Sequence, residues 1–226
     1  MTDSFRRAAL LIVLASAVGR LPGPADPPPS LAGRRLSLED ALRRLPGRNQ
    51  AWSGLPGDAL NLVFVGAEEK IIASLASAGW TRVPRSMASS IGAGLRELAR
   101  GRWPAAFPPM HGYRLFGKLQ DINFSIPTRF PLSRHHFRLW RSPFTDPAGR
   151  PIWWGSADYD VSIRWRDLSH RTDPDTTRER DFVAATLKDK AALRWLPLPQ
   201  IPKEGENDRG YAFRNDGRAL LAVFTF

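Results

Sequence analysis

Hydrophobic residues between positions 60 and 80 follow two different spacings. Residues 60–66 form a short run that is almost entirely apolar, which is typical of a buried strand. In the following segment, residues 67–78, Ile71 and Leu75 recur at helical spacing on one face. Trp80 then begins a second extended piece. The pattern therefore predicts a strand, a helix and a strand in succession.

After Gly112 the pattern changes to an alternation of apolar and polar residues, which is the signature of half-buried strands. The segments that alternate most clearly are residues 121–126, 135–141 and 158–165. In each segment one face carries aliphatic and aromatic side chains, and the other face is polar. The charged residues of the polar faces include His136, Arg138, Asp158, Asp160 and Arg164.

Two more helices and a central strand are indicated nearer the ends of the chain. Residues 36–45 form a short amphipathic helix with a serine cap and acidic residues in the first turn. Residues 176–190 form a longer helix, in which Thr176 and Glu179 have the spacing of a capping box. Residues 219–226 are apolar on both faces, which predicts a central strand.

The remaining segments give weaker signals. Residues 86–102 contain interrupting glycines and predict a helix only towards their end, residues 195–198 suit a strand, and residues 49–58 suit a loop. Together the elements predict one α+β domain over residues 36–226, with a mostly antiparallel sheet packed with two or three helices.

The first 17 residues have the form of a secretory signal peptide. Arg6 and Arg7 precede an apolar run that is short for a membrane span, and residues 15–17 fit a cleavage site of small residues. An uncleaved membrane anchor is the alternative. Residues 18–35 are rich in proline and predict an extended spacer. We therefore expect an exported protein that is periplasmic, bound to the cell envelope or secreted.

Composition narrows the classes of function. The chain has no cysteine, which excludes disulfides, a thiol nucleophile and cysteine-ligated zinc. The net charge is +11, but acidic residues are interspersed among the basic ones, which argues against nucleic-acid binding. The excess of arginine instead suits an anionic lipid or glycan, or a protein of the envelope.

Several segments, taken in order, resemble the LssY C-terminal domain family. They are residues 61–66, 78–80, 115–121, 134–140, 154–157, 170–175 and 179–181. The resemblance spans roughly residues 60–190 and rests on the order and spacing of these pieces. It implies a bacterial envelope protein, because this domain often follows membrane segments or a phosphatase-type domain. The signature residues of that phosphatase are missing from this sequence, so the resemblance implies no phosphatase activity.

The polar faces of the alternating segments carry the candidate chemistry. If the segments pair side by side, His136 and Asp158 come onto one surface with His170 at its rim. The catalytic candidates are His170, His136, Asp173 and Asp158. Histidine can act as an acid or a base near neutral pH. An ordinary solvated sheet face with cross-strand ion pairs is the alternative, and Asp173 also fits a chain reversal before a helix.

Arginine forks bind phosphate or carboxylate with two parallel hydrogen bonds. The anion-binding candidates are Arg138, Arg164 and Arg171. His135, His136 and His170 could also supply metal ligands together with nearby aspartates, but the close spacing of a metal motif is missing. The sequence therefore predicts neither a metal nor a cofactor. A Ser-His-Asp hydrolase is a poor fit, because the sequence contains no G-x-S-x-G motif.

The sequence favours an exported or envelope-associated binding or accessory domain with peripheral membrane association. Its partner would be an anionic lipid, a glycan or an envelope protein. The alternative is a hydrolase or phosphoesterase that uses a cluster of histidine, aspartate and arginine, and a third candidate is a structural part of an export complex. Convergence of the polar residues in a pocket would favour the enzyme, whereas an open sheet would favour the binding domain.

Overall fold

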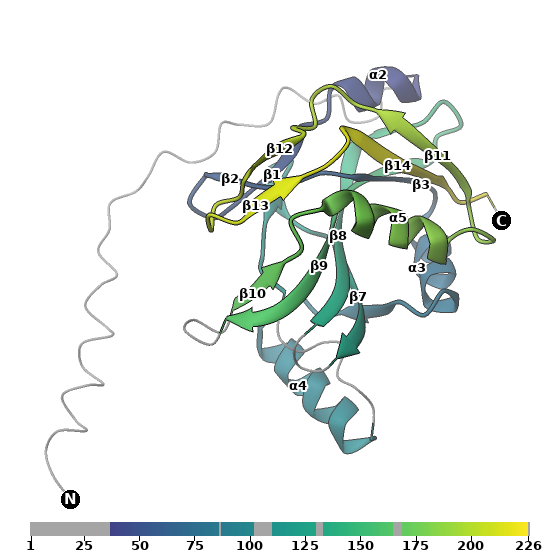
Figure 1. Cartoon of the computed structure of the whole chain (residues 1–226). Helices are drawn as coiled ribbons and strands as arrows, with labels where there is room; N and C mark the ends of the chain where they lie inside the picture. Colours follow the sequence, from purple (N-terminus) through teal and green to yellow (C-terminus); the bar gives the residue numbers. More distant parts are fainter. Residues whose placement is uncertain (1–36, 86, 102–109, 130–132, 165–168, 226) are drawn as a thin grey trace, which may run out of the picture.

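The computed structural model describes residues 37–85, 87–101, 110–129, 133–164 and 169–225 (Figure 1). These residues form a single α+β domain of mostly antiparallel strands, with four helices in the described ranges. The predicted fold class is therefore confirmed. The predicted signal peptide, residues 1–17, and the spacer, residues 18–35, lie outside the described residues. Among the helices that the structure describes, none has the length and apolar character needed to cross a membrane.

An eight-stranded sheet organises the domain. Its strands are β3 (Leu62–Val65), β4 (Thr81–Val83), β7 (Ile122–Arg129), β8 (Ser133–Thr145), β9 (Pro151–Arg164), β10 (Ser169–Thr172), β11 (Ala192–Pro197) and β14 (Arg218–Val223). Their order is β11-β14-β3-β9-β8-β7-β4, and β10 pairs with β9. Within this sheet the β14–β3 pair is parallel and the other described pairs are antiparallel. Because β14 lies between β11 and β3, the central strand predicted over residues 219–226 is confirmed, but the strand ends at Val223.

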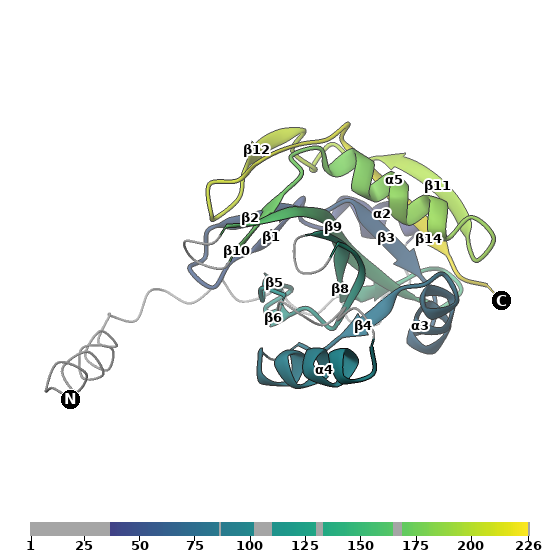
Figure 2. The same ribbon diagram turned by 60° about the horizontal axis from the view of Figure 1, so that its bottom comes forward.

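Four helices pack around this sheet. They are α2 (Leu38–Arg43), α3 (Glu68–Ser77), α4 (Met87–Ala99) and α5 (Thr176–Thr186). Ser37 caps α2 by accepting a hydrogen bond from the main-chain N–H of Asp40, as its sequence position predicts. Figure 2 shows α5 and α4 on opposite sides of the curved strands β8 and β9. The helix α4 extends over most of the segment that carried only a weak helical signal.

A smaller sheet has the order β2-β1-β5-β6, and a separate hairpin stands beside it. The strands are β1 (Arg48–Gln50), β2 (Pro56–Ala59), β5 (Arg114–Leu115) and β6 (Lys118–Leu119), and the hairpin consists of β12 (Glu204–Glu206) and β13 (Ala212–Arg214). The loop expected over residues 49–58 is therefore wrong at both ends, since β1 and β2 pair across it. These strands are too short to alternate visibly, and β1 also pairs with β5, which lies far away in the sequence.

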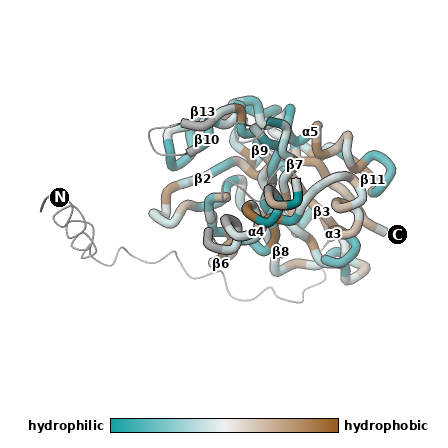
Figure 3. The backbone as a smooth tube through the Cα atoms, turned by 90° about the horizontal axis from the view of Figure 1, so that it is seen from below, coloured by the Kyte–Doolittle hydropathy of each residue, from teal (hydrophilic) through white to brown (hydrophobic). Residues whose placement is uncertain are grey.

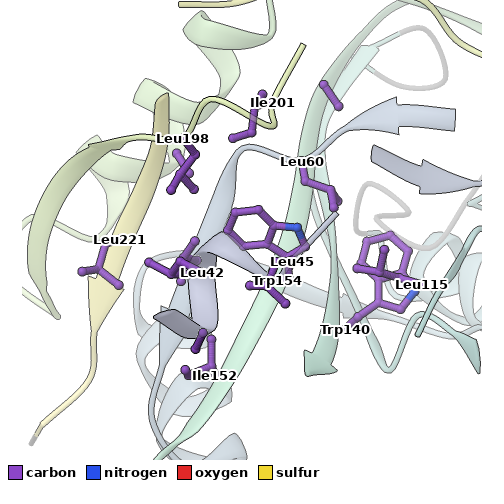
Figure 4. Close-up of a cluster of buried hydrophobic side chains, with 14 of the residues drawn as sticks. Leu42, Leu45, Leu60, Leu115, Trp140, Ile152, Trp154, Leu198, Ile201 and Leu221 are labelled. Carbon is purple, nitrogen blue, oxygen red and sulfur yellow. The ribbon is translucent and has the colours of Figure 1, made fainter. Parts of the chain in front are cut away.

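Two hydrophobic cores lie on the two faces of the large sheet. Val63 and Val65 of β3 belong to one core, and Leu62 and Phe64 belong to the other, because successive side chains point to opposite faces. Figure 4 shows the first core, with Trp154 packed among leucines. In Figure 3 hydrophobic segments lie mostly within the body and hydrophilic segments mostly at its outer turns. The largest fully buried side chains are those of Trp140, Trp153 and Trp154.

The two longest strands, β8 and β9, form the hairpin that carries the site. Gly155 of β9 pairs with Leu139 of β8 on one side and with Leu62 of β3 on the other. A Cβ atom at this position would lie 2.6 Å from the carbonyl oxygen of Arg138. Glycine is therefore required for this close approach of β9 to β8.

Candidate functional site

A set of ionisable side chains lies on one face of the β8–β9 hairpin. Arg134 pairs with Asp160 and His136 pairs with Asp158 in the antiparallel register. Because side chains alternate along a strand, these residues share a face with Arg138. The expectation that the polar segments pair side by side is therefore confirmed. We refer to Arg134, His136, Arg138, Asp158, Asp160 and His170 as the polar cluster.

The polar cluster is not the solvated sheet face that was the alternative expectation. Each of its five residues on β8 and β9 is at most 6% exposed. The side chain of His170, on β10, is 10% exposed. Unpaired charges are costly at such depth, so the contacts among these groups determine which of them carries a charge.

Asp160 is the ionised centre of the polar cluster. Its Oδ2 atom accepts a hydrogen bond of 2.9 Å from Nε of Arg134 and lies 3.4 Å from Nδ1 of His136 and 3.9 Å from Nδ1 of His170. Burial alone would raise the pKa of Asp160, but His136, Arg134 and His170 together bring it below its ordinary value. Asp160 therefore holds one arginine and two imidazoles around a single carboxylate.

Asp158 is in the opposite state. Burial, and next the carboxyl group of Asp58, raise the pKa of Asp158 well above its ordinary value. Nη1 of Arg138 lies 3.7 Å from its Oδ2 atom, too far for a hydrogen bond, and that oxygen has no hydrogen-bond partner among the described residues. The surroundings of Asp158 therefore favour its protonated, uncharged form. The pKa values of two carboxyl groups on one strand face are shifted in opposite directions.

Arg138 connects the polar cluster to the surface. Its Nε atom donates to the carbonyl oxygen of His111 at 3.2 Å, and its Nη1 atom donates to Oδ2 of Asp58 at 3.4 Å. Its guanidinium also lies over the ring of Tyr113, 5.0 Å from the centroid. His111 is exposed, so this end of the polar cluster borders solvent. Partial desolvation of the ring, followed by the charges of Arg209 and Arg138, lowers the pKa of His111, which favours the neutral imidazole.

A small hollow lies beside Asp158. Residues from β2, β9, the turn before α5 and the β12–β13 hairpin line it, among them Asp58, Asp158, Asp173, Asn207 and Tyr211. It has room for about one water molecule. The hollow itself therefore has space for a water molecule, and a larger ligand would have to approach from the solvent-exposed side at His111.

The opposite face of β8 carries a second buried pair. Nδ1 of His135 lies 2.7 Å from Oε2 of Glu179 in α5, and the His135 ring stacks on Phe182 with centroids 3.6 Å apart. Burial raises the pKa of Glu179 to about 9 and lowers the pKa of His135 to about 4. The capping box expected for Glu179 is therefore wrong. Its side chain points into the protein, and the N-cap residue of α5 is Asp175 without a side-chain cap.

The turn before α5 has a structural role. The main-chain N–H of Asp173 donates to the carbonyl of Tyr159, and Oδ1 of Asp173 accepts from the main-chain N–H of Asp175 at 2.9 Å. This is an Asx turn that reverses the chain into the helix. The carboxyl group of Asp173 borders the hollow but lies in this turn, which supports the structural alternative for this residue.

The structure brings together three of the four catalytic candidates, His136, His170 and Asp158. The three anion-binding candidates are not gathered in the same way. Arg138 is buried in the polar cluster, Arg171 is exposed, and the side chain of Arg164 lies outside the described residues.

The sequence did not predict two of these residues as candidates. They are Arg134 of the polar cluster and Asp58, which accepts a hydrogen bond from Arg138. Arg134 lies two residues before His136, so its side chain is on the same strand face as those of His136 and Arg138. Extending the strand expected at residues 135–141 by one residue would have included Arg134 on this face. Asp58 had no comparable signal, because it belongs to the short strand β2 and approaches Arg138 only through the tertiary fold.

The part of the chain that the structure describes contains no group of three or more histidine, aspartate or glutamate side chains arranged to hold a metal ion. In the described residues both histidines of the polar cluster lie close to Asp160, whose carboxylate is also bonded to Arg134.

The fold and the site define a class of protein, namely a single α+β domain whose curved antiparallel sheet buries a network of histidine, arginine and aspartate. Within that class the chain belongs to the family described as LssY C-terminus, whose model matches residues 42–218. This extends beyond the segments that carried the resemblance in the sequence. No curated protein and no solved structure matches the chain significantly.

Proposed function

We propose that the chain is an exported or envelope-associated binding domain that recognises an anionic group on a lipid, a glycan or a protein partner. The observation that carries the proposal is the bonding of Arg138. Its guanidinium is buried, yet its contacts to His111, Asp58 and Asp158 span 3.2–3.7 Å. Charge-assisted hydrogen bonds are ordinarily about 2.7–2.9 Å long. Donors of this guanidinium therefore remain suited to an incoming anion.

The protonation states around Arg138 support an anionic ligand. The raised pKa of Asp158 favours its uncharged form, so the ion pair that Arg138 keeps is the long contact of 3.4 Å to Asp58. The lowered pKa values of His111 and His136 keep both imidazoles neutral near pH 7. A bound anion would raise both pKa values, because a nearby negative charge favours the protonated imidazole. Binding should then strengthen as the pH falls.

Sulfate is a suitable probe, because its charge does not change near neutral pH. Calorimetric titration should show tighter binding at about pH 5.5 than at about pH 7.5. Replacing Arg138 with glutamine should weaken binding by about 1.5–3 kcal/mol, which is on the order of ten- to a hundredfold. The matched control is Arg141→Gln, which removes an exposed arginine from the same strand. Equal weakening by both substitutions, or binding that does not depend on pH, would contradict the proposal.

Export is the second part of this proposal and is supported by the first 17 residues of the sequence. A basic pair, an apolar run and a small-residue site are the features that secretion signals share. N-terminal sequencing of the protein from the cell envelope should find a chain that begins after Ala17. A cytoplasmic protein that retains Met1 would argue against export.

A hydrolase is a second candidate, and the unlike states of Asp158 and Asp160 favour it. A protonated carboxyl and an ionised one stand two residues apart on β9, next to the imidazoles of His136 and His170. Pairs of carboxyl groups with pKa values pushed apart are typical of acid–base catalysis. If this is their role, Asp158→Asn should abolish turnover of a phosphoester such as p-nitrophenyl phosphate while the fold persists. An absence of turnover by the unmodified protein would leave the binding function.

A further inference from the structure

An exposed apolar patch lies at one end of the small sheet, on residues that are not members of the polar cluster. Trp52 and Leu55, in the turn between β1 and β2, are 61% and 54% exposed, and Leu119 of β6 is 37% exposed. A Cβ atom at Gly112 would lie 3.4 Å from Nε1 of Trp52 and 3.3 Å from Cδ2 of Leu119. The two side chains therefore lie close to one another. We refer to Trp52, Leu55 and Leu119 as the tip patch.

One arginine is held directly against the tip patch. The guanidinium of Arg114 lies over the Trp52 ring, 4.2 Å from the centroid, because Gln50 of β1 pairs with Arg114 of β5. No carboxylate lies within ion-pair distance of Arg114 in the described residues. The nearby Lys118 is instead paired with Asp121 at 2.7 Å. The tip patch therefore combines an amphipathic indole, two leucines and one unneutralised positive charge.

The size of the tip patch favours a lipid surface over a protein partner. A fully buried aromatic side chain contributes about 150–250 Å², so three partly exposed side chains amount to a few hundred Å². A stable protein interface needs about 800 Å² on each partner. A tryptophan at the tip of a turn, with an arginine held over its ring, is instead suited to the interface of a bilayer. There the indole ring lies among the headgroups and the guanidinium meets acidic lipids.

We propose that the tip patch inserts into the surface of a bilayer that contains acidic phospholipid. Trp52 and Leu55 enter the interfacial region, and Arg114 contacts lipid phosphates from the side of the indole ring. The net charge of +11 attracts the whole chain to the same surface. This inference uses none of the polar cluster residues, so it stands or falls separately from the anion site at Arg138.

The chain has no cysteine, so a single introduced cysteine can report on the tip alone. Ser53 is exposed between Trp52 and Gly54, and the full chain carrying Ser53→Cys can be labelled with an environment-sensitive dye. Vesicles of phosphatidylcholine with phosphatidylglycerol should shift its emission to the blue. The same dye at Lys188→Cys, an exposed position just after α5, should not respond. This readout reports insertion of the tip whether or not other parts of the chain bind the vesicles.

Three substitutions in the labelled chain complete the test. Trp52→Ser should abolish the blue shift, and Arg114→Gln should raise the vesicle concentration needed on the order of fivefold for acidic vesicles only. Arg138→Gln should leave the shift unchanged, and Trp52→Ser should leave sulfate binding unchanged. The proposal is overturned by a shift that is equal at both label positions or unaffected by Trp52→Ser. A shift that appears without vesicles and grows with protein concentration also overturns it, in favour of contact between two copies.

Discussion

Asp158 and Asp160 stand on the same strand face, yet their surroundings give them different charges. Arg134, His136 and His170 surround Asp160 and lower its pKa, whereas burial and the nearby Asp58 raise the pKa of Asp158. Replacing the carboxyl group with a neutral amide should therefore change the stability of the fold differently at the two positions. The polar cluster can be tested for this difference through stability alone, without knowledge of a ligand.

Asp160→Asn should destabilise the fold by about 3–5 kcal/mol, because it removes the carboxylate that is bonded to the buried guanidinium of Arg134. Asp158→Asn should be at least as stable as the unmodified protein at pH 7. A carboxyl group with a raised pKa holds a proton that the unfolded chain has released, so it destabilises the fold as the pH rises above about 4. Urea titrations of both variants measure this. Equal losses at the two positions would contradict the assigned charges.

At the scale of elements, the contact between α5 and β8 depends on a pair of ionisable groups that are both neutral. Glu179 of α5 and His135 of β8 share one proton near neutral pH, because the pKa is about 9 for the acid and about 4 for the imidazole. In the unfolded chain their ordinary values are 4.5 and 6.5. The folded and unfolded states therefore hold the same number of protons between about pH 4.5 and 6.5.

Above pH 6.5 the unfolded chain has lost both protons, while the folded pair keeps one until about pH 9. This pair should therefore reduce stability as the pH rises from 6.5 to 9, by up to about 1.4 kcal/mol per pH unit. Glu179→Gln retains a donor to His135 but cannot titrate, so its stability should not fall in this range. Thermal unfolding of both proteins from pH 5 to 9 measures the difference. Parallel curves would show that Glu179 is ionised in the folded protein.

At the scale of the whole molecule, the last strand completes the centre of the large sheet. β14 pairs with β11 on one side and with β3 on the other, so it joins a neighbour close in sequence to one near the start of the domain. Its buried residues Leu220, Leu221 and Ala222 contribute to both cores. The two cores therefore depend on a segment that the chain reaches last.

Deletion of residues 218–226 should prevent folding, because it removes a central strand and leaves the facing edges of the buried strand β3 and of β11 unpaired. Circular dichroism and limited proteolysis of the truncated chain measure this. The control is deletion of residues 225–226, since the carbonyl oxygen of Thr225 accepts only a long, exposed hydrogen bond of 3.4 Å from Nζ of Lys70. A truncated chain that resists protease as well as the control does would show that β14 is dispensable.

The sequence determined the elements and the faces of the strands. Alternation after Gly112 separated Phe137 and Leu139 from His136 and Arg138, and the apolar segment 219–226 predicted the central strand that the structure has up to Val223. These features follow from side-chain periodicity, which is local and can be recognised within one segment. The family could also be identified, because its segments appear in order along most of the chain.

Only the tertiary structure decided which polar residues meet and how deeply they are buried. Asp58 reaches Arg138 from a short strand 80 positions away, and Glu179 turns inward to His135 instead of capping its helix. The charge states of Asp158 and Asp160 likewise depend on neighbours from β8, β10 and β2. Register, pairing order and desolvation arise from contacts between segments that are distant in sequence, and no local pattern encodes them.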